Sequence, residues 1–210
     1  MNNFDRKAHW ERVYQTKELK DAGWYQPVPK TSLDFIEAIK LPLDSRIIDI
    51  GGGDSLLVDH LLKLGYRDVT ILDISETAIE RAKARLGDLS GMVKWVVSDV
   101  SNFRPSGVFD FWHDRATFHF LTDKSEISNY VETARQSIRP EGILFIGTFS
   151  DRGPKSCSGI EIRQYSALSM SELFKKYFKN IQCFTVDHKT PSGNLQNYVF
   201  CGFKRLKENP

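Results

Sequence analysis

The segment Asp49-Ile50-Gly51-Gly52-Gly53 places an acidic residue directly before a glycine-rich turn. The turn follows the apolar run 46–50 and precedes a segment with helical periodicity. Small residues let the backbone approach a ligand closely, and the start of a helix offers N–H groups and a positive dipole end. The segment therefore predicts a ligand with a nucleoside part against this turn.

Two further carboxylates end the next two apolar runs. Asp73 ends the run 69–74, at about the 20-residue offset at which a strand-end acid accepts the hydroxyls of a ribose. Asp99 ends the run 92–100, and its carboxylate can accept a hydrogen bond from an adenine amino group. Three successive strands thus end in acids, which predicts an adenosine site. The alternative is a doubly wound protein in which these acids only cap helices.

The glycine turn also distinguishes between nucleotide ligands. Leu56 stands where the dinucleotide fingerprint G-x-G-x-x-G needs its third glycine, which argues against NAD and FAD. A pyrophosphate gains nothing from a nearby carboxylate, whereas the ammonium and sulfonium of S-adenosylmethionine (SAM) are attracted to Asp49. We therefore expect SAM as the cofactor.

Together these motifs resemble those of class I SAM-dependent methyltransferases. Asp49 to Gly53 match the first motif of that family, Asp73 matches its ribose-binding acid, and Ser98-Asp99-Val100 matches its adenine motif. Nearly the whole chain resembles a bacterial branch of the family whose substrate is unassigned. The resemblance implies S-adenosylhomocysteine as product and cofactor contacts from Asp49, Gly51, Gly52, Gly53, Asp73, Ile74, Asp99 and Val100.

The segment 113–121 follows the fourth predicted strand and is expected to face the transferable methyl group. It resembles the Asp-Lys-Gly-Thr stretch of elongation-factor lysine methyltransferases and the Asp/Glu-Arg-Gly stretch of thiopurine methyltransferases, but has Arg115-Ala116 at the variable pair. Asp114 is predicted to hold the methionine ammonium or orient the nucleophile, with helix capping as the alternative. His119 is a candidate general base, with plain packing as the alternative. Arg115 is a candidate substrate contact.

Aromatic residues are frequent in the N-terminal leader, residues 1–30. Its His-Trp-x-x-x-Tyr pattern ending at Tyr14 resembles the elongation-factor lysine methyltransferases, and Trp24-Tyr25 resembles a segment that closes over SAM in several branches. Each aromatic face over a desolvated sulfonium is worth roughly 0.5–2 kcal/mol. We predict that Trp24 and Tyr25 belong to a lid over the cofactor, and that Trp10 and Tyr14 attach the leader to the domain.

Further substrate contacts are expected in the C-terminal half. The irregular segment 148–159 is a candidate substrate loop, in which Cys157 is either a soft ligand or acceptor thiol, or a buried inert thiol. Arg163 could bind a substrate carboxylate in bidentate fashion, or form a surface ion pair. His188 and Gln196 face each other only if the register of a predicted hairpin allows it.

The predicted elements alternate between strand and helix. Helices are expected after the N-cap candidates Thr31 and Ser32, over 54–64, from Ser75 to about 86, over 125–138, and from a capping box at 169–172. The predicted strands cover 46–50, 69–74, 92–97, 108–113, 143–147, 181–187 and 196–203. This order predicts an α/β fold, a Rossmann-like doubly wound sheet of seven strands that is mostly parallel and ends in an antiparallel hairpin.

Composition sets the remaining expectations. With 210 residues and no composition break, residues 1–210 are expected to form one domain. A net charge of +2 gives no reason to expect nucleic acid. Three widely spaced cysteines without C-x-x-C argue against a disulfide framework or a zinc site, and for a reducing compartment. Because no apolar run has signal-peptide or membrane-spanning length, a cytoplasmic protein without a membrane partner is expected.

The expected function is SAM-dependent methyl transfer by in-line displacement to a small-molecule acceptor. A protein-lysine N-methyltransferase is the rival hypothesis that the likeness in the leader and in 113–121 suggests. A non-catalytic SAM-binding module and an NAD-dependent oxidoreductase are two further hypotheses. The acceptor atom stays open.

Overall fold

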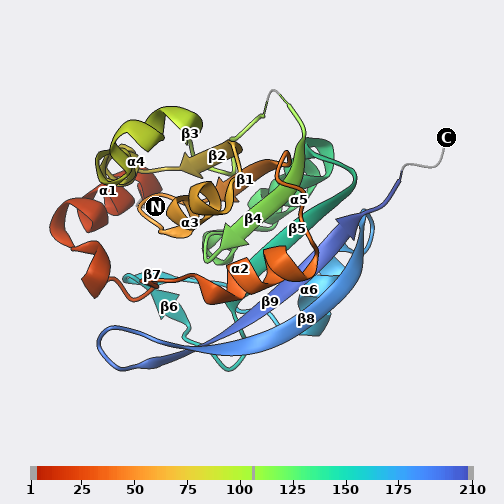
Figure 1. The fold of residues 1–210 in the computed structure, drawn as a ribbon. Coiled ribbons are helices and arrows are strands. Elements are labelled where there is room, and N and C mark those ends of the chain that lie inside the picture. Colours follow the sequence, from red (N-terminus) through yellow and green to blue (C-terminus); the bar gives the residue numbers. More distant parts are fainter. Residues whose placement is uncertain (1–3, 106, 208–210) are drawn as a thin grey trace.

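A seven-stranded sheet forms the centre of the computed structural model, which describes residues 4–105 and 107–207 (Figure 1). The strands are β1 (Arg46–Ile50), β2 (Asp68–Asp73), β3 (Val93–Val97), β4 (Phe109–Arg115), β5 (Ile138–Phe149), β8 (Phe178–Lys189) and β9 (Leu195–Arg205). They lie in the order β3-β2-β1-β4-β5-β9-β8. Neighbours among β1 to β5 are parallel, and β9 is antiparallel to both β5 and β8. The predicted fold class and the C-terminal hairpin are confirmed.

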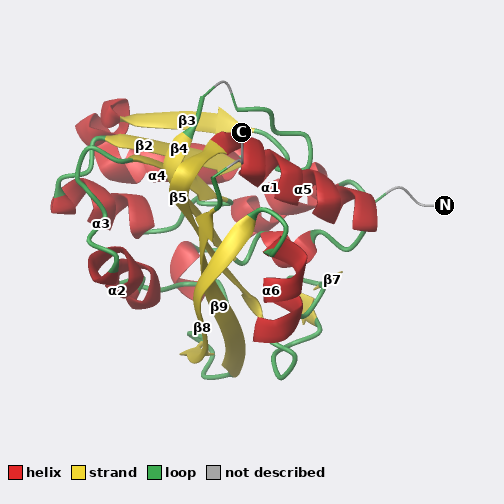
Figure 2. Ribbon diagram, turned by 90° about the vertical axis from the view of Figure 1, so that its right-hand side faces the viewer, coloured by secondary structure: helices red, strands yellow, loops and turns green. Residues whose placement is uncertain are grey.

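Helices cover both faces of this sheet (Figure 2). Residues on alternate sides of a strand pack against different helices, as the two-residue period of a strand requires. Ile47 and Phe111 contact the apolar side of α2 and α3, whereas Ile48 and Trp112 belong to the core with α5 and α6. The helices are α1 (Arg6–Thr16), α2 (Lys30–Ala38), α3 (Leu57–Leu64), α4 (Glu76–Leu86), α5 (Lys124–Ser137) and α6 (Ala167–Phe174).

Short elements connect these layers. Three 3₁₀ turns cover Leu19–Asp21, Gly87–Met92 and Phe118–Phe120. A two-stranded ribbon of β6 (Ser156–Cys157) and β7 (Ile160–Glu161) lies within the expected substrate loop and just after it. The sequence did not predict this ribbon, because two-residue strands leave no periodicity to detect.

Helix ends agree with the sequence at some positions and differ at others. Ser75 caps α4, as predicted, and Gly65 ends α3 in the left-handed region. The predicted helix α2 is present, but its N-cap is Pro29, and the N-cap candidates Thr31 and Ser32 lie inside its first turn. The capping box of α6 consists of Ser166 and Ser169, three residues before the predicted one.

A disulfide joins Cys183 and Cys201, which corrects the expectation that the cysteines stay unpaired. The two residues are direct partners in the ladder between β8 and β9, so their Cα atoms are 4.2 Å apart. Sequence spacing gave no sign of this, because the pairing depends on the hairpin register. The argument for a reducing compartment, which rested on unpaired cysteines, therefore loses its basis.

Within the described residues, no helix is long and apolar enough to cross a membrane.

Close packing between α2 and the sheet yields a stability prediction at Gly202 in β9. A Cβ atom there would lie 2.5 Å from the Phe35 ring, so we expect Gly202→Ala to lower the free energy of unfolding by about 1–3 kcal/mol. Gly91→Ala is the matched control, since nothing lies within 4 Å of its added Cβ, and it should change stability by less than about 0.5 kcal/mol. Urea denaturation measures both variants; equal effects would contradict the packing argument.

Candidate active site

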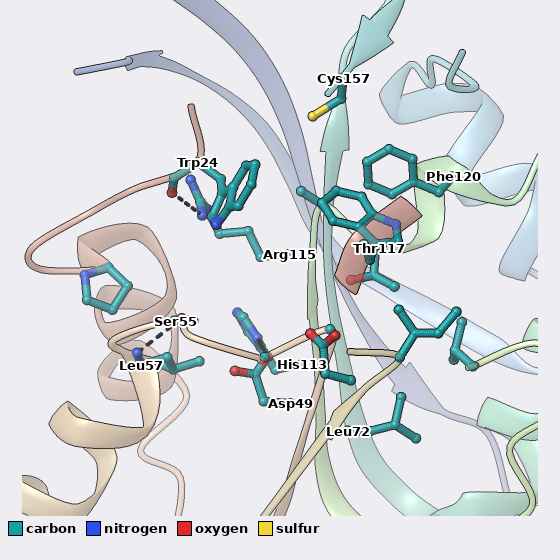
Figure 3. A pocket seen from close by; sticks show the side chains of 18 of the residues that line it. Trp24, Asp49, Ser55, Leu57, Leu72, His113, Arg115, Thr117, Phe120 and Cys157 are labelled. Atoms are coloured by element: carbon teal, nitrogen blue, oxygen red, sulfur yellow. Dashed lines mark hydrogen bonds and ion pairs between the residues drawn. The ribbon is translucent and has the colours of Figure 1, made fainter. Parts of the chain in front are cut away.

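One pocket opens at the carboxyl ends of β1, β2 and β4, and the leader folds over it (Figure 3). It contains about 1160 Å³ of unfilled space, its open mouth included. Many residues singled out in the sequence line this pocket and come from distant parts of the chain. They are Trp24, Tyr25, Asp49, Gly51, Gly52, Asp73, Ile74, Asp99, Val100, Arg115 and Cys157.

The glycine turn after β1 is shaped by close contacts on both sides. A Cβ atom on Gly51, whose φ is +64°, would lie 1.8 Å from Thr117 Oγ1. One on Gly52 would lie 2.6 Å from Asp49 Oδ2. The N–H groups of both glycines donate to the Leu72 carbonyl, at 2.7 and 3.2 Å. The turn therefore offers close approach to its backbone, while the N–H groups of Gly51 and Gly52 are already bonded within the protein. Gly53 does not line the pocket.

Asp49 is held by a chain of hydrogen bonds that runs through His113 to Ser32. Asp49 Oδ1 lies 2.6 Å from His113 Nδ1, and His113 Nε2 lies 2.8 Å from Ser32 Oγ. All three residues are buried, and Asp49 is the direct partner of His113 in the ladder between β1 and β4. Figure 3 shows Asp49 and His113 side by side in the wall of the pocket. A buried carboxylate needs such a partner, so His113 positions Asp49.

Asp73 ends β2 and is nearly inaccessible to solvent. Its Oδ1 accepts a hydrogen bond of 2.8 Å from the Ser75 N–H. Burial raises the pKa of Asp73 to about 7, with Asp49 and Glu11 adding to the rise and the Ser75 bond opposing it. Burial of the Asp73 carboxylate lowers the stability of the fold, which is typical of a group placed for binding rather than for stability.

Asp99 lies two residues after β3 and is paired with the leader. Its Oδ2 accepts a hydrogen bond of 2.8 Å from Arg6 Nη1, and Ser101 N–H donates to its Oδ1. Arg6 also contacts Glu126 at 2.8 Å. Glu11, further along α1, accepts hydrogen bonds from the first residues of α4. These contacts fix α1 over the edge of the pocket.

The two residues predicted as catalytic do not line the pocket. Asp114 is fully buried, and its carboxylate accepts hydrogen bonds from Tyr130 Oη and from the backbone of Thr117 and Phe118. Burial raises the pKa of Asp114 to about 6 against these bonds. Burial, assisted by Arg115, lowers the pKa of His119 to about 3, so this imidazole is neutral at neutral pH. Asp114 therefore caps the 117–120 turn and His119 is a packing residue, which are the structural roles that the sequence had left open.

The predicted substrate residues separate into two groups. Arg115 and Cys157 line the pocket, and burial raises the pKa of the Cys157 thiol. Arg163 is exposed and lies over the Tyr165 ring, outside the pocket. His188 and Gln196 are direct partners between β8 and β9, so the required register is present, but neither lines the pocket. His188 Nε2 lies 2.8 Å from the Gly23 carbonyl and so contacts the leader.

Several lining residues were missed or assigned only a packing role. Trp10, Tyr14 and Trp24 form a ring cluster with centroids 5.9–6.1 Å apart, and Phe120 packs on Trp10 at 5.0 Å. The aromatic content of the leader indicated such a cluster. Nothing local in the sequence pointed to Tyr198, because β9 reaches the site only through the sheet order.

Among the described residues, no group of three or more His, Cys, Asp or Glu side chains could hold a metal ion.

Comparisons with known proteins find methyltransferases. Residues 47–142 match a family model described as a methyltransferase domain. Human EEF1A lysine methyltransferase 2 is 27% identical over 145 residues, which cover 63% of this chain and 60% of that protein. Malonyl-[acyl-carrier protein] O-methyltransferase 1 of Ilyobacter polytropus is 31% identical over 87 residues, 41% of this chain and 32% of that protein. The chain thus spans less than two thirds of the length of these curated relatives.

A solved structure supports the fold. The N-methyltransferase NodS of Bradyrhizobium japonicum, in complex with S-adenosylhomocysteine, matches with a TM-score of 0.70 and 15% identity over 97% of this chain and 100% of that chain. At this identity the likeness concerns the fold alone.

Removing His113 tests the buried chain of hydrogen bonds. His113→Leu leaves both Asp49 Oδ1 and Ser32 Oγ without this partner, so we expect a loss of about 1–3 kcal/mol in the free energy of unfolding. Ser32→Ala removes only the outer bond and should cost less. Chemical denaturation compares the two, and a larger loss for Ser32→Ala would contradict the assignment.

The raised pKa of Asp73 predicts that replacing this carboxylate by a neutral side chain increases stability, by an amount that depends on pH. Because the folded value of about 7 lies above the ordinary 3.8, the folded state binds more protons between these values and its stability falls as the pH rises through this window. At roughly 1.4 kcal/mol per pKa unit, Asp73→Asn should be more stable than the wild type by at least about 1 kcal/mol at pH 8, with little difference near pH 4.

Asp110→Asn is the control with the opposite sign. Partial burial alone would raise the pKa of Asp110, but hydrogen bonds from Arg46 and Arg139 lower it to about 2. Asp110→Asn should therefore be less stable than the wild type at pH 7, and the difference should shrink as the pH falls from about 4 towards 2. Thermal melts across this pH range measure both variants; the same sign for both would refute the argument.

Proposed function

We propose that this chain, which belongs to the class I SAM-dependent methyltransferases, binds SAM in the pocket at β1, β2 and β4 and methylates a small-molecule acceptor. The observation that carries the proposal is the meeting of Asp49, Asp73 and Asp99 around one pocket beside a turn that admits only glycine. When bound, SAM supplies an activated methyl group for displacement by an acceptor nucleophile.

The residues of the pocket fit this cofactor. The Asp73 carboxylate lines the pocket and can accept hydrogen bonds from the ribose hydroxyls. Asp99 has lone pairs left beside its bonds to Arg6 and Ser101 and can accept from the adenine amino group. Asp49 carries a buried negative charge towards the methionine end, where an ammonium and a sulfonium are attracted to it.

The leader closes this site. α1 is anchored by Arg6 on Asp99 and by Glu11 on the start of α4, both next to the adenosine end of the pocket. Trp24 and Tyr25 line the pocket further along, and their rings can lie against a sulfonium. We propose that residues 4–29 act as the lid and exclude water from the reacting groups.

Positioning accounts for most of the proposed rate acceleration. Good alignment of two reacting groups alone is worth roughly 7–11 kcal/mol. The histidine that lines the pocket, His113, is engaged with Asp49 and Ser32, and His119 lies outside it. The proposed mechanism therefore assigns no general base to these two histidines.

Protein-lysine methylation is the second candidate, because the names of several relatives state that activity. The aromatic-walled pocket, which the leader partly covers, favours a small acceptor. An NAD-dependent oxidoreductase has less support, since Leu56 precedes α3 at the position of the missing glycine and lines the pocket.

Calorimetric titration with S-adenosylhomocysteine, SAM and NADH tests the cofactor. We expect micromolar binding of the first two ligands. Asp73→Asn should weaken that binding at least about tenfold, since a hydrogen bond to a charged group is worth about 1.5–3 kcal/mol. The matched control is Asp68→Asn, an acid at the opposite end of the same strand that pairs with Lys94 at the surface. Binding of NADH without binding of SAM would overturn the proposal.

A further inference from the structure

Arg115 is a pocket cation without an acidic partner. It is the last residue of β4 and lines the pocket beside the glycine turn. The other arginine of the lining, Arg6, is paired with both Asp99 and Glu126. Among the residues that the structure describes, no carboxylate forms an ion pair with Arg115.

The Arg115 guanidinium is held in place by uncharged groups. Its Nη1 donates a hydrogen bond of 2.9 Å to the Trp24 carbonyl, and its Cζ lies 5.4 Å from the centre of the Tyr198 ring. Its Nε is buried and has no hydrogen-bond partner among the described residues. Figure 3 shows the side chain reaching Trp24 on one side of the pocket. A fixed guanidinium with an unused buried donor is suited to a planar anion.

The surroundings of Arg115 are aromatic. Trp24, Phe120 and Tyr198 line this part of the pocket, together with Cys157. The carboxylates that line the pocket are Asp49, Asp73 and Asp99, and each is engaged elsewhere, by His113, Ser75 and Arg6. The charge of Arg115 is therefore balanced by no lining group.

We propose that Arg115 binds a carboxylate of the methyl acceptor and that the acceptor is a small aromatic carboxylic acid. The inference rests on the proposed function and specifies its substrate class. The aromatic walls take the apolar ring, and Arg115 neutralises and orients the carboxylate. A lysine side chain fits the same place poorly, because its ammonium would stand beside an unpaired guanidinium and no free acid.

Binding of matched acids and amides tests this proposal. The probes are benzoate, 4-hydroxybenzoate and indole-3-acetate, each beside its neutral amide, and a lysine-containing peptide. They are titrated calorimetrically into the free protein and into protein saturated with S-adenosylhomocysteine. For at least one pair we expect the wild type to bind the acid about tenfold or more tightly than the amide, which is about 1.4 kcal/mol.

Arg115→Gln should abolish the preference for the acid, and Arg115→Lys should keep part of it, because lysine retains the charge but loses the planar pair of donors. Arg104→Gln is the matched control: this arginine is exposed, lies outside the pocket and donates to the neighbouring Phe103 carbonyl. The Arg104→Gln variant should prefer the acid over the amide to within about twofold of the wild-type ratio. Unchanged melting temperatures show that the variants are folded.

The outcomes separate this proposal from the proposed function. If S-adenosylhomocysteine binds but amides or the lysine peptide bind as well as the acids, or if Arg115→Gln keeps the preference, the anion site is refuted and the cofactor assignment stands. If the acids bind through Arg115 but S-adenosylhomocysteine does not, the anion site stands and the methyltransferase function fails. If neither binds, both are overturned.

Discussion

The buried contact between Asp49 and His113 is the interaction on which the geometry of the site depends. It joins β1 to β4 near the point where both strands end, and through Ser32 it also fixes the first turn of α2. A buried carboxylate costs free energy unless it is bonded, so the packing of α2 on the sheet is less stable when any of the three residues is removed. Gly51 follows Asp49 by two residues and Arg115 follows His113 by two residues, so this contact also helps to fix the glycine turn and Arg115.

The charged residues of the site lower the stability of the fold. Asp73 is buried, with the two acids Asp49 and Glu11 nearby, which is why its pKa rises so far. Arg115 carries its charge against a carbonyl and an aromatic ring. By contrast, Asp110 at the opposite end of β4 is tied to two arginines and stabilises the fold. The two ends of this strand thus show the difference between groups arranged for binding and groups arranged for stability.

Much of the sheet could be predicted from the sequence, because parallel strands buried on both faces leave largely apolar runs such as 46–50 and 69–74. The three acids were recognisable for the same reason, as each follows such a run. Helix α1 of the leader could not be predicted, since Trp10 is the one buried residue of this helix and the contacts of α1 to Asp99 and α4 are long-range. The roles of Asp114 and His119 were also beyond the sequence. Whether a side chain at the end of β4 or just after it points into the pocket or away from it depends on the 117–120 turn, which no periodicity reveals.

The close contact between Gly51 and Thr117 couples the glycine turn after β1 to the segment after β4. Thr117 Oγ1 occupies the space where any side chain at position 51 would begin, and it also bonds the Ile50 carbonyl. The glycine turn and the segment 115–120 are therefore in direct contact through the Thr117 hydroxyl. Libraries that vary 115–120 to change which molecules the pocket accepts will retain a working turn only where position 117 keeps a small hydroxyl or a smaller group. Substitutions at 51 and 117 should accordingly show strong epistasis.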